Sequence, residues 1–206
     1  MFDATTAGAT WSESQLWHLI DERTKPDADT KAIDERIWSL FGSEWTVMAT
    51  DLCGFSRRTS EFGIMHFLQV IQEFKKRVFP IVANYDGIVV KVEADSLILL
   101  FRTPQKALDC AIDMQRACDV LNVGRDPEFQ ILLCVGIGHG DVLRIGETDV
   151  FGHEVNGACN LGEDIAKAGE ILLTGAALER LAESPGSTEP LDADVPGVTA
   201  AFRYLY

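Results

Sequence analysis

The chain has 206 residues, of which 47% are apolar and 24% are charged, a composition typical of a folded globular protein. Its formal net charge of −14 argues against binding to nucleic acid or to an anionic membrane surface, so neither is an expected partner. No stretch approaches the roughly 20 apolar residues of a membrane span, and the N-terminus lacks the basic start and apolar core of a secretory signal. The five cysteines form no CxxC pair, which indicates free thiols in a reducing compartment, and a cytoplasmic location is therefore expected.

Residues 1–42 are expected to form an N-terminal helical extension and linker. Residues 12–23 predict an amphipathic helix whose Ser–Glu start resembles a capping box, and residues 32–42 predict a second short helix that ends at Gly42. A turn-rich linker joins the two. This extension is too short for a sensory domain, which leaves packing on a dimer as its expected role.

Residues 43–206 are expected to form one α+β domain. Hydrophobic spacing and turn residues predict, in chain order, a buried strand at 45–52, a helix at 62–85 kinked at Pro80, two strands in 86–101 around a tight reversal, a helix at 104–123, a strand pair in 129–146 that is broken or bulged between Gly138 and Gly140, a helix in 150–164, a strand at 169–174, a helix at 175–184, a linker at 185–197 and a strand at 199–206. The order βαββαβ with later additions predicts a mixed sheet with helices on one face.

Two aspartates lie at the ends of apolar strands, Asp51 in "VMATDLCGF" and Asp95 in "KVEADSLILLF". Aspartate is a poor strand residue, and a carboxylate beside buried apolar side chains is costly unless it is paired or bound to a metal ion. Each could simply cap a turn. Alternatively, both converge from neighbouring strands to hold Mg²⁺, which prefers carboxylate and phosphate oxygens.

Other polar residues have simpler interpretations. His66 lies in an apolar helix and is expected to be a core or interface residue, because no second His or Cys is spaced for a metal site. His139 lies between two glycines and is expected to occupy a turn. The "GIGHG" segment is not a dinucleotide fingerprint, since it lies between predicted strands and does not open a helix.

Five segments resemble, in order and spacing, the catalytic domain of class III nucleotidyl cyclases. They are "TDLCGFS", "DGIVVKVEADSLILLF", "VGIGHGDVLRIG", "DVFGHEVNGACNL" and "GEILLT". The resemblance implies a cyclase homology domain with a ferredoxin-like core and a mixed, mainly antiparallel sheet. It also implies a head-to-tail homodimer with its sites at the interface.

The resemblance assigns a metal and phosphate half-site. Asp51 and Asp95 match the two metal-binding aspartates, and the Leu52 carbonyl would complete the coordination of two Mg²⁺ or Mn²⁺ ions. The N–H groups of the following turn would contact the triphosphate, with Cys53, Gly54 and Phe55 as the residues concerned.

The resemblance also assigns a base and ribose half-site, which would come from the other subunit. Lys91 matches the residue that recognises the base, and Asp149 matches its partner in adenine recognition. In the family, lysine at the first position goes with adenine and glutamate with guanine. Lysine can donate to a ring nitrogen while a carboxylate accepts from the amino group. Asn156 matches the asparagine that contacts the ribose.

The sequence departs from the family pattern at two positions. Asn160 replaces the arginine that stabilises charge on the phosphates in the transition state, and a neutral amide offers two donors but no charge. Loss of a charged donor of this kind typically costs about 10²–10³-fold in rate, so Asn160→Arg is expected to raise turnover if the position is a weakened catalytic one. Ala94 replaces the glycine before Asp95, which should slightly stiffen the hairpin.

The expected function is conversion of a nucleoside triphosphate, ATP in the first place, to its 3′,5′-cyclic monophosphate and pyrophosphate by two-metal-assisted attack of the ribose 3′-hydroxyl. Two alternatives remain open. The first is a catalytically impaired nucleotide-binding or dimerisation module, for which Asn160 is the reason. The second is a cyclase for a pyrimidine nucleotide.

Overall fold

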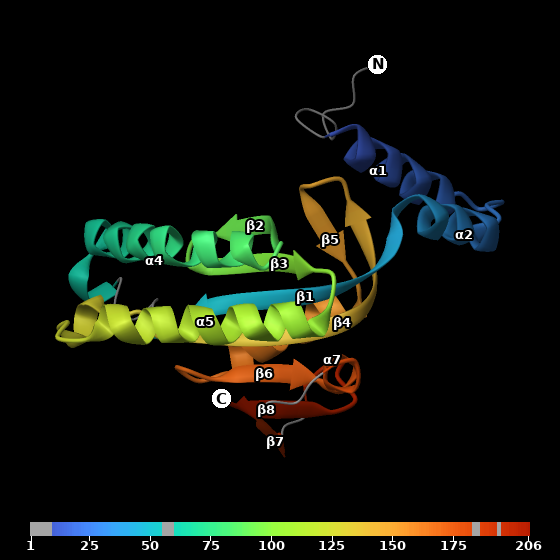
Figure 1. Cartoon of the computed structure of the whole chain (residues 1–206). Helices are drawn as coiled ribbons and strands as arrows, with labels where there is room; N and C mark the ends of the chain where they lie inside the picture. Colours follow the sequence, from blue (N-terminus) through green and yellow to red (C-terminus); the bar gives the residue numbers. More distant parts are fainter. Residues whose placement is uncertain (1–9, 55–59, 183–185, 193–194) are drawn as a thin grey trace.

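The structure is a computed structural model that describes residues 10–54, 60–182, 186–192 and 195–206. Figure 1 shows how its elements are arranged around a central sheet. In chain order they are α1 (Trp11–Arg23), α2 (Thr30–Phe41), β1 (Gly42–Leu52), α4 (Ile64–Asn84), β2 (Ile88–Glu93), β3 (Ser96–Phe101), α5 (Pro104–Asn122), the 3-10 helix η2 (Pro127–Phe129), β4 (Leu133–Ile145), β5 (Asp149–Phe151), α6 (His153–Cys159), the π-helix η3 (Asn160–Ile165), β6 (Ile171–Thr174), α7 (Gly175–Glu179), β7 (Ser187–Pro190) and β8 (Ala201–Leu205).

The described strands form one eight-stranded sheet in the order β2-β3-β1-β4-β6-β8-β7, with β5 paired to β4 beside this path. Strand β6 runs parallel to β4, whereas the other pairs are antiparallel. Elements β1, α4, β2, β3, α5 and β4 follow the predicted βαββαβ order. The mixed, mainly antiparallel α+β fold is therefore confirmed. Within the described residues, no helix has the length and apolar character needed to cross a bilayer.

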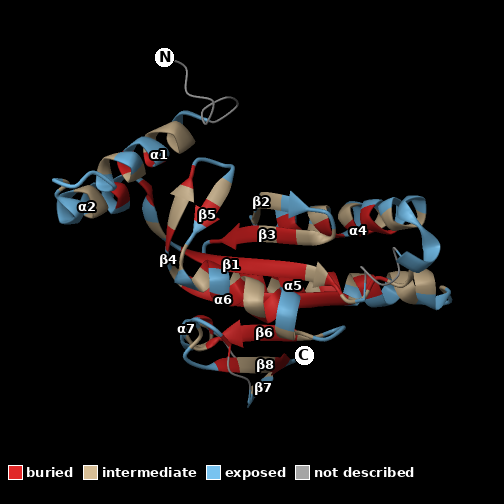
Figure 2. Ribbon diagram, turned by 180° about the vertical axis from the view of Figure 1, so that it is seen from behind, coloured by how far each residue is buried: buried red, intermediate tan, exposed pale blue. Residues whose placement is uncertain are grey.

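Helices cover both faces of the sheet, so the expectation of helices on one face is wrong. Helices α4 and α5 cover one face (Figure 1), and α6 lies on the other (Figure 2). Alternate residues of β1 reach the two cores: Met48 packs in the α4–α5 core, and Val47 and Ala49 pack in the core that contains α6. Burial of a side chain the size of valine or methionine stabilises the folded state by about 1.5–3 kcal/mol. Both faces of the sheet therefore need helices that exclude water from their apolar side chains.

Glycines of β4 allow α6 to lie directly on the sheet. A Cβ built at Gly136 would lie 2.2 Å from the carbonyl oxygen of Ala158, and one built at Gly138 would lie 2.5 Å from that of Glu154. Strand β4 nevertheless pairs with β1 without interruption from Leu133 to Leu143. The predicted break or bulge is wrong, because the glycines provide space for a helix and do not disturb the ladder.

His139 lies in the middle of β4 and not in a turn, so that expectation is also wrong. It is buried, and its Nδ1 lies 2.9 Å from the Thr46 hydroxyl on β1. The simpler interpretation of His66 holds: its side chain is half-buried, its Nε2 lies 2.8 Å from the Glu128 carbonyl oxygen, and its ring packs on Phe129.

Helices α1 and α2 form a helical hairpin at one end of the sheet (Figure 1). A capping box does begin α1, but its residues are Thr10 and Glu13 and not the expected Ser–Glu start. Leu16 and Phe41 pack with Ile145 of β4 in a separate small core. Helix α2 ends before Gly42, as predicted, and β1 begins at that residue.

Helix α4 continues through Pro80 to Asn84, which confirms a single helix over this segment, and the kink at the proline stays a prediction. One further segment differs from expectation. Part of the predicted C-terminal linker forms strand β7, which pairs with β8 from Ser187 opposite Leu205 to Pro190 opposite Phe202. Its short polar sequence carries little strand signal of its own, and pairing with β8 supplies the missing stabilisation.

We predict that Gly138→Ala lowers the free energy of unfolding by about 2 kcal/mol, because the new methyl group would overlap the backbone of α6. Gly124→Ala is the matched control. Its φ of +73° makes alanine unfavourable there, but a Cβ would meet nothing within 4 Å, so a loss of about 1 kcal/mol is expected. Urea denaturation of both variants measures the difference, and equal losses would contradict the close packing of α6.

Candidate active site

Asp51 and Asp95 lie together at one end of the sheet. Thr50 of β1 pairs with Leu97 of β3, which brings Asp51 level with Ser96, the neighbour of Asp95. The Ser96 hydroxyl donates to Asp51 Oδ1 over 3.2 Å. The antiparallel register therefore brings together two carboxylates that are 44 positions apart in the sequence, as predicted from the two strand ends.

The two carboxylates repel each other. Burial and the neighbouring Asp51 charge raise the pKa of the Asp95 carboxyl to about 6. Glu163 of η3 is exposed overall, but partial desolvation of its carboxyl and the charge of Asp51 raise its pKa as well. This end of the sheet is therefore strongly electronegative, and a bound cation would relieve the repulsion.

The donor set fits a hard divalent cation, which binds carboxylate oxygens and keeps positions free for phosphate or water. Within the described residues, no group of three or more His, Cys, Asp and Glu side chains is arranged to hold a metal ion. Asp51 and Asp95 alone would thus leave most coordination positions to other ligands. The Leu52 carbonyl, at the end of β1, belongs to the same strand end.

The hairpin turn before Asp95 carries local strain. Ala94 has a φ of +51°, in the left-handed region that glycine adopts without cost. An L-alanine in this backbone conformation destabilises the fold by about 1 kcal/mol. Ala94 therefore occupies a conformation that favours glycine, the residue that the family pattern has at this position. The expected stiffening of the hairpin stays a prediction.

Lys91 and Asp149 form an ion pair. The Lys91 Nζ on β2 lies 2.9 Å from Asp149 Oδ1 on β5, and both side chains are partly buried. The hydrogen bond with Asp149 raises the pKa of Lys91, which stays protonated. Lys91 lies opposite Ile98, whose side chain packs in the core that contains α6, so the pair belongs to that face of the sheet.

Asn156 and Asn160 lie four residues apart along α6 and the start of η3. The Asn156 side chain is exposed. The Asn160 amide donates from Nδ2 to the Pro196 carbonyl oxygen over 3.0 Å, a contact 36 residues away in the sequence. The structure therefore places these two residues on the face of Lys91 and Asp149, but gives Asn160 a partner within the chain.

The predicted phosphate turn is described only in part. The Cys53 N–H donates to the Leu132 carbonyl oxygen over 2.8 Å, so it is already satisfied within the chain. Gly54 is exposed and has a φ of +75°, in the left-handed region that favours glycine. Phe55 lies outside the described residues.

Sequence reasoning missed Glu154, which fixes the start of α6. Its Oε2 accepts hydrogen bonds from the His139 backbone N–H at 3.0 Å and from the Thr174 hydroxyl at 2.7 Å. The carboxylate thus ties α6 to β4 and to the end of β6. A glutamate in the first turn of a helix has an ordinary explanation in the helix dipole, so its sequence context carried no signal of this role.

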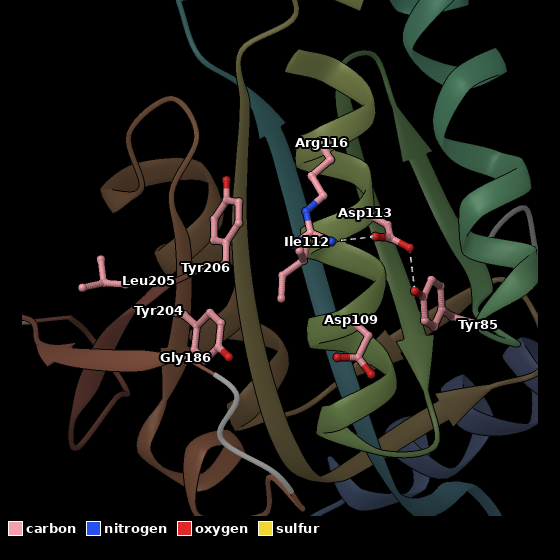
Figure 3. A pocket seen from close by; sticks show the side chains of 9 residues that line it. All are labelled: Tyr85, Asp109, Ile112, Asp113, Arg116, Gly186, Tyr204, Leu205 and Tyr206. Carbon is pink, nitrogen blue, oxygen red and sulfur yellow. Dashed lines mark hydrogen bonds and ion pairs between the residues drawn. The ribbon is translucent and has the colours of Figure 1, made fainter. Parts of the chain in front are cut away.

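A cavity of about 360 Å³ lies on the opposite face, between α5 and the C-terminal strand (Figure 3). Its carboxylates already have partners: the Tyr85 hydroxyl donates to Asp113 over 2.6 Å, and Arg116 lies 3.5 Å from the same carboxyl group. Asp109 adds a further negative charge to the wall. A cavity of this chemistry would repel a triphosphate, and we place no nucleotide there.

We predict that Asp95→Asn stabilises the metal-free protein at pH 8. The pKa of Asp95 is about 6 in the folded state, above its ordinary value of 3.8. Between these values the folded state holds a proton that the unfolded state has released, so stability falls as pH rises from about 4 to about 6. The asparagine variant lacks this penalty, and its melting temperature should exceed that of the wild type at pH 8 and approach it at pH 5. Exposed Asp119→Asn is the control in EDTA-containing buffer, and equal shifts for both variants at pH 8 would contradict the repulsion.

A family model of the adenylate and guanylate cyclase catalytic domain matches residues 42–200. Among curated proteins, the chain is 28% identical over 153 residues to serine/threonine-protein kinase pkn2 of Myxococcus xanthus, covering 74% of this chain and 18% of that protein. It is 27% identical over 128 residues to putative adenylate cyclase 3 of Rhizobium meliloti, covering 62% and 22%. The chain thus spans about a fifth of the length of these relatives.

Solved structures show the same fold. An adenylate/guanylate cyclase/hydrolase from Silicibacter pomeroyi superposes with a TM-score of 0.66 at 24% identity, covering 80% of this chain and 98% of that one. The adenylyl cyclase CyaB from P. aeruginosa superposes with a TM-score of 0.69 at 20% identity, covering 80% and 95%. With its fold and the family match over most of its length, the chain belongs to the family of adenylate and guanylate cyclase catalytic domains.

Proposed function

We propose that the protein is a nucleotidyl cyclase that converts ATP to 3′,5′-cyclic AMP and pyrophosphate. The observation that carries the proposal is the close pair of Asp51 and Asp95, in which burial and mutual repulsion raise the pKa of Asp95 to about 6. Such a pair costs folding stability, and a bound cation would offset this cost.

In this proposal, Asp51 and Asp95 hold Mg²⁺ or Mn²⁺, with the Leu52 carbonyl and the triphosphate completing the coordination. Two bound ions would lower the pKa of the 3′-hydroxyl and stabilise the attacking and leaving oxygens. The ribose 3′-oxygen forms a bond to the α-phosphorus, the bond from that phosphorus to the β-phosphate oxygen breaks, and the hydroxyl proton leaves to solvent. Asn156 would hold the ribose so that attack and departure are in line.

The choice of ATP rests on the Lys91–Asp149 pair. The two groups lie 2.9 Å apart, close enough to contact one edge of a base. Adenine presents a ring nitrogen that accepts from the Lys91 ammonium and an amino group that donates to the Asp149 carboxylate. Guanine presents the opposite pattern at these positions.

A head-to-tail homodimer would complete each site. Lys91 and Asp149 form a pair between β2 and β5, whereas Asp51 and Asp95 lie at the end of β1 and the β2–β3 turn. We propose that each site combines the two aspartates of one subunit with Lys91, Asp149 and Asn156 of the other. A monomer would then bind nucleotide poorly and would not cyclise it.

We predict that purified protein with Mn²⁺ or Mg²⁺ forms a cyclic product from ATP and not from GTP, CTP or UTP, as measured by chromatography. Asp51→Asn should reduce the rate at least about a hundredfold, because one oxygen of the metal pair is lost. Asp113→Asn is the control, a carboxylate on the opposite face. A product from CTP or UTP alone would indicate a pyrimidine cyclase. Metal-dependent nucleotide binding without turnover would indicate the binding module.

We predict that the double variant Lys91→Glu with Asp149→Lys reverses base preference. It keeps a pair of opposite charges between β2 and β5 but exchanges donor and acceptor, which suits guanine and leaves adenine unpaired. The ratio of kcat/KM for ATP to that for GTP should fall about a hundredfold or more, because mispaired polar groups are strongly rejected. The single variant Lys91→Glu is the control, since it places two carboxylates together. An unchanged ratio in the double variant would show that this pair does not contact the base.

A further inference from the structure

A turn from the C-terminal part of the chain, residues 195–198, packs against α6. A Cβ built at Gly157 would lie 3.0 Å from Cγ2 of Val198, so this glycine makes room for the valine side chain. A Cβ built at Gly197 would lie 3.3 Å from Cε1 of His153. His153, Gly157 and Asn160 are spaced i, i+4 and i+7, and therefore form one stripe along the helix.

The 195–198 turn has a defined conformation. The Val198 N–H donates to the Val195 carbonyl oxygen over 3.0 Å, which closes a four-residue turn. Pro196 is its second residue, and Gly197, with a φ of +79°, is its third, the sequence and conformation of a type II turn. Val195 is buried with Leu161 in a small core. The turn is thus anchored, and it presents the Pro196 carbonyl oxygen to the Asn160 amide.

Helix α6 needs a tertiary contact at its C-terminal end. It has seven residues and passes directly into the π-helix η3. A helix of this length is marginal without tertiary contacts, and π-helical turns are rare and often lie at functional sites. Glu154 ties its first turn to the sheet. At the other end, the Asn160 side chain bonds to the turn.

We propose that Asn160 is a positioning residue: its amide holds the 195–198 turn against α6 and so fixes the helix that presents Asn156. This inference rests on the proposed function, and it differs from the expectation that Asn160 donates to the phosphates. The side chain at this position is directed to a carbonyl oxygen of its own chain. Asn156 lies one helical turn away, so loosening this end of α6 displaces its amide.

The test compares Asn160→Ala, Val198→Ala and their double variant with Tyr206→Phe. The Tyr206 hydroxyl donates to the Gly169 carbonyl oxygen over 2.9 Å, so the control loses a similar bond in another place. Hydrogen exchange of residues 153–165 should accelerate about fivefold in Asn160→Ala, the effect of one hydrogen bond, and should not change in Tyr206→Phe. The kcat for ATP should fall about tenfold with little change in KM, because orientation is lost and binding is kept.

The double variant decides between positioning and direct contact. If Asn160 and Val198 hold the same turn, the double variant should be no slower than the slower single variant. Rate losses that multiply would overturn the proposal, as would a kcat of Asn160→Ala equal to that of Tyr206→Phe. A faster Asn160→Arg with unchanged exchange would also overturn it, in favour of a direct role at the phosphates.

Failure of the proposed function gives a different result. The wild-type protein would then form no cyclic product from ATP. Hydrogen exchange of residues 153–165 in Asn160→Ala would still show whether the amide holds the turn against α6. Exchange equal to that of the wild type would refute the inference in that case as well.

Discussion

The close approach of α6 and η3 to the sheet is the contact on which the functional face depends. A Cβ at Gly162 would lie 2.6 Å from the Ala49 carbonyl oxygen, and one at Gly136 would lie 2.5 Å from the Gly162 N–H nitrogen. Backbone therefore meets backbone from β1 and β4 on one side and from η3 on the other. This spacing places the polar residues of α6 near strand residues that carry charge, and larger side chains would move them apart.

Charge accounts for much of the rest of the site. The chain carries a formal charge of −14, and two interacting carboxylates, Asp51 and Asp95, lie at one end of the sheet. Such an arrangement lowers the stability of the metal-free fold, a common cost of a site built for a ligand. In the proposed site, the same acidity would disfavour a phosphate that carries no cation. Binding of a triphosphate would then require that it arrive with its cations.

Much of the fold could be predicted because it follows from local patterns. The periodicity of β1, α4 and α5 reflects burial, and the convergence of Asp51 and Asp95 follows from a strand beside a hairpin. The pairing of Lys91 with Asp149 came only from the resemblance, since no local pattern links two such distant residues. What could not be predicted depends on distant partners. The glycines of β4 indicated a bulge because the helix that needs them follows 13 or more residues later, and the partner of Asn160 is a carbonyl oxygen in the C-terminal turn.

If the Lys91–Asp149 ion pair recognises the base as proposed, its geometry has a consequence for selectivity. Both groups are satisfied before any base arrives, so a base that binds there exchanges partners with an existing contact. An adenine edge can accept from the ammonium and donate to the carboxylate at the same time, which makes the exchange nearly even. A base with the opposite pattern would leave the ion pair intact and its own edge without partners. Discrimination would then come from the cost of binding the wrong base, because its polar atoms lose hydrogen bonds to water and form none with the protein.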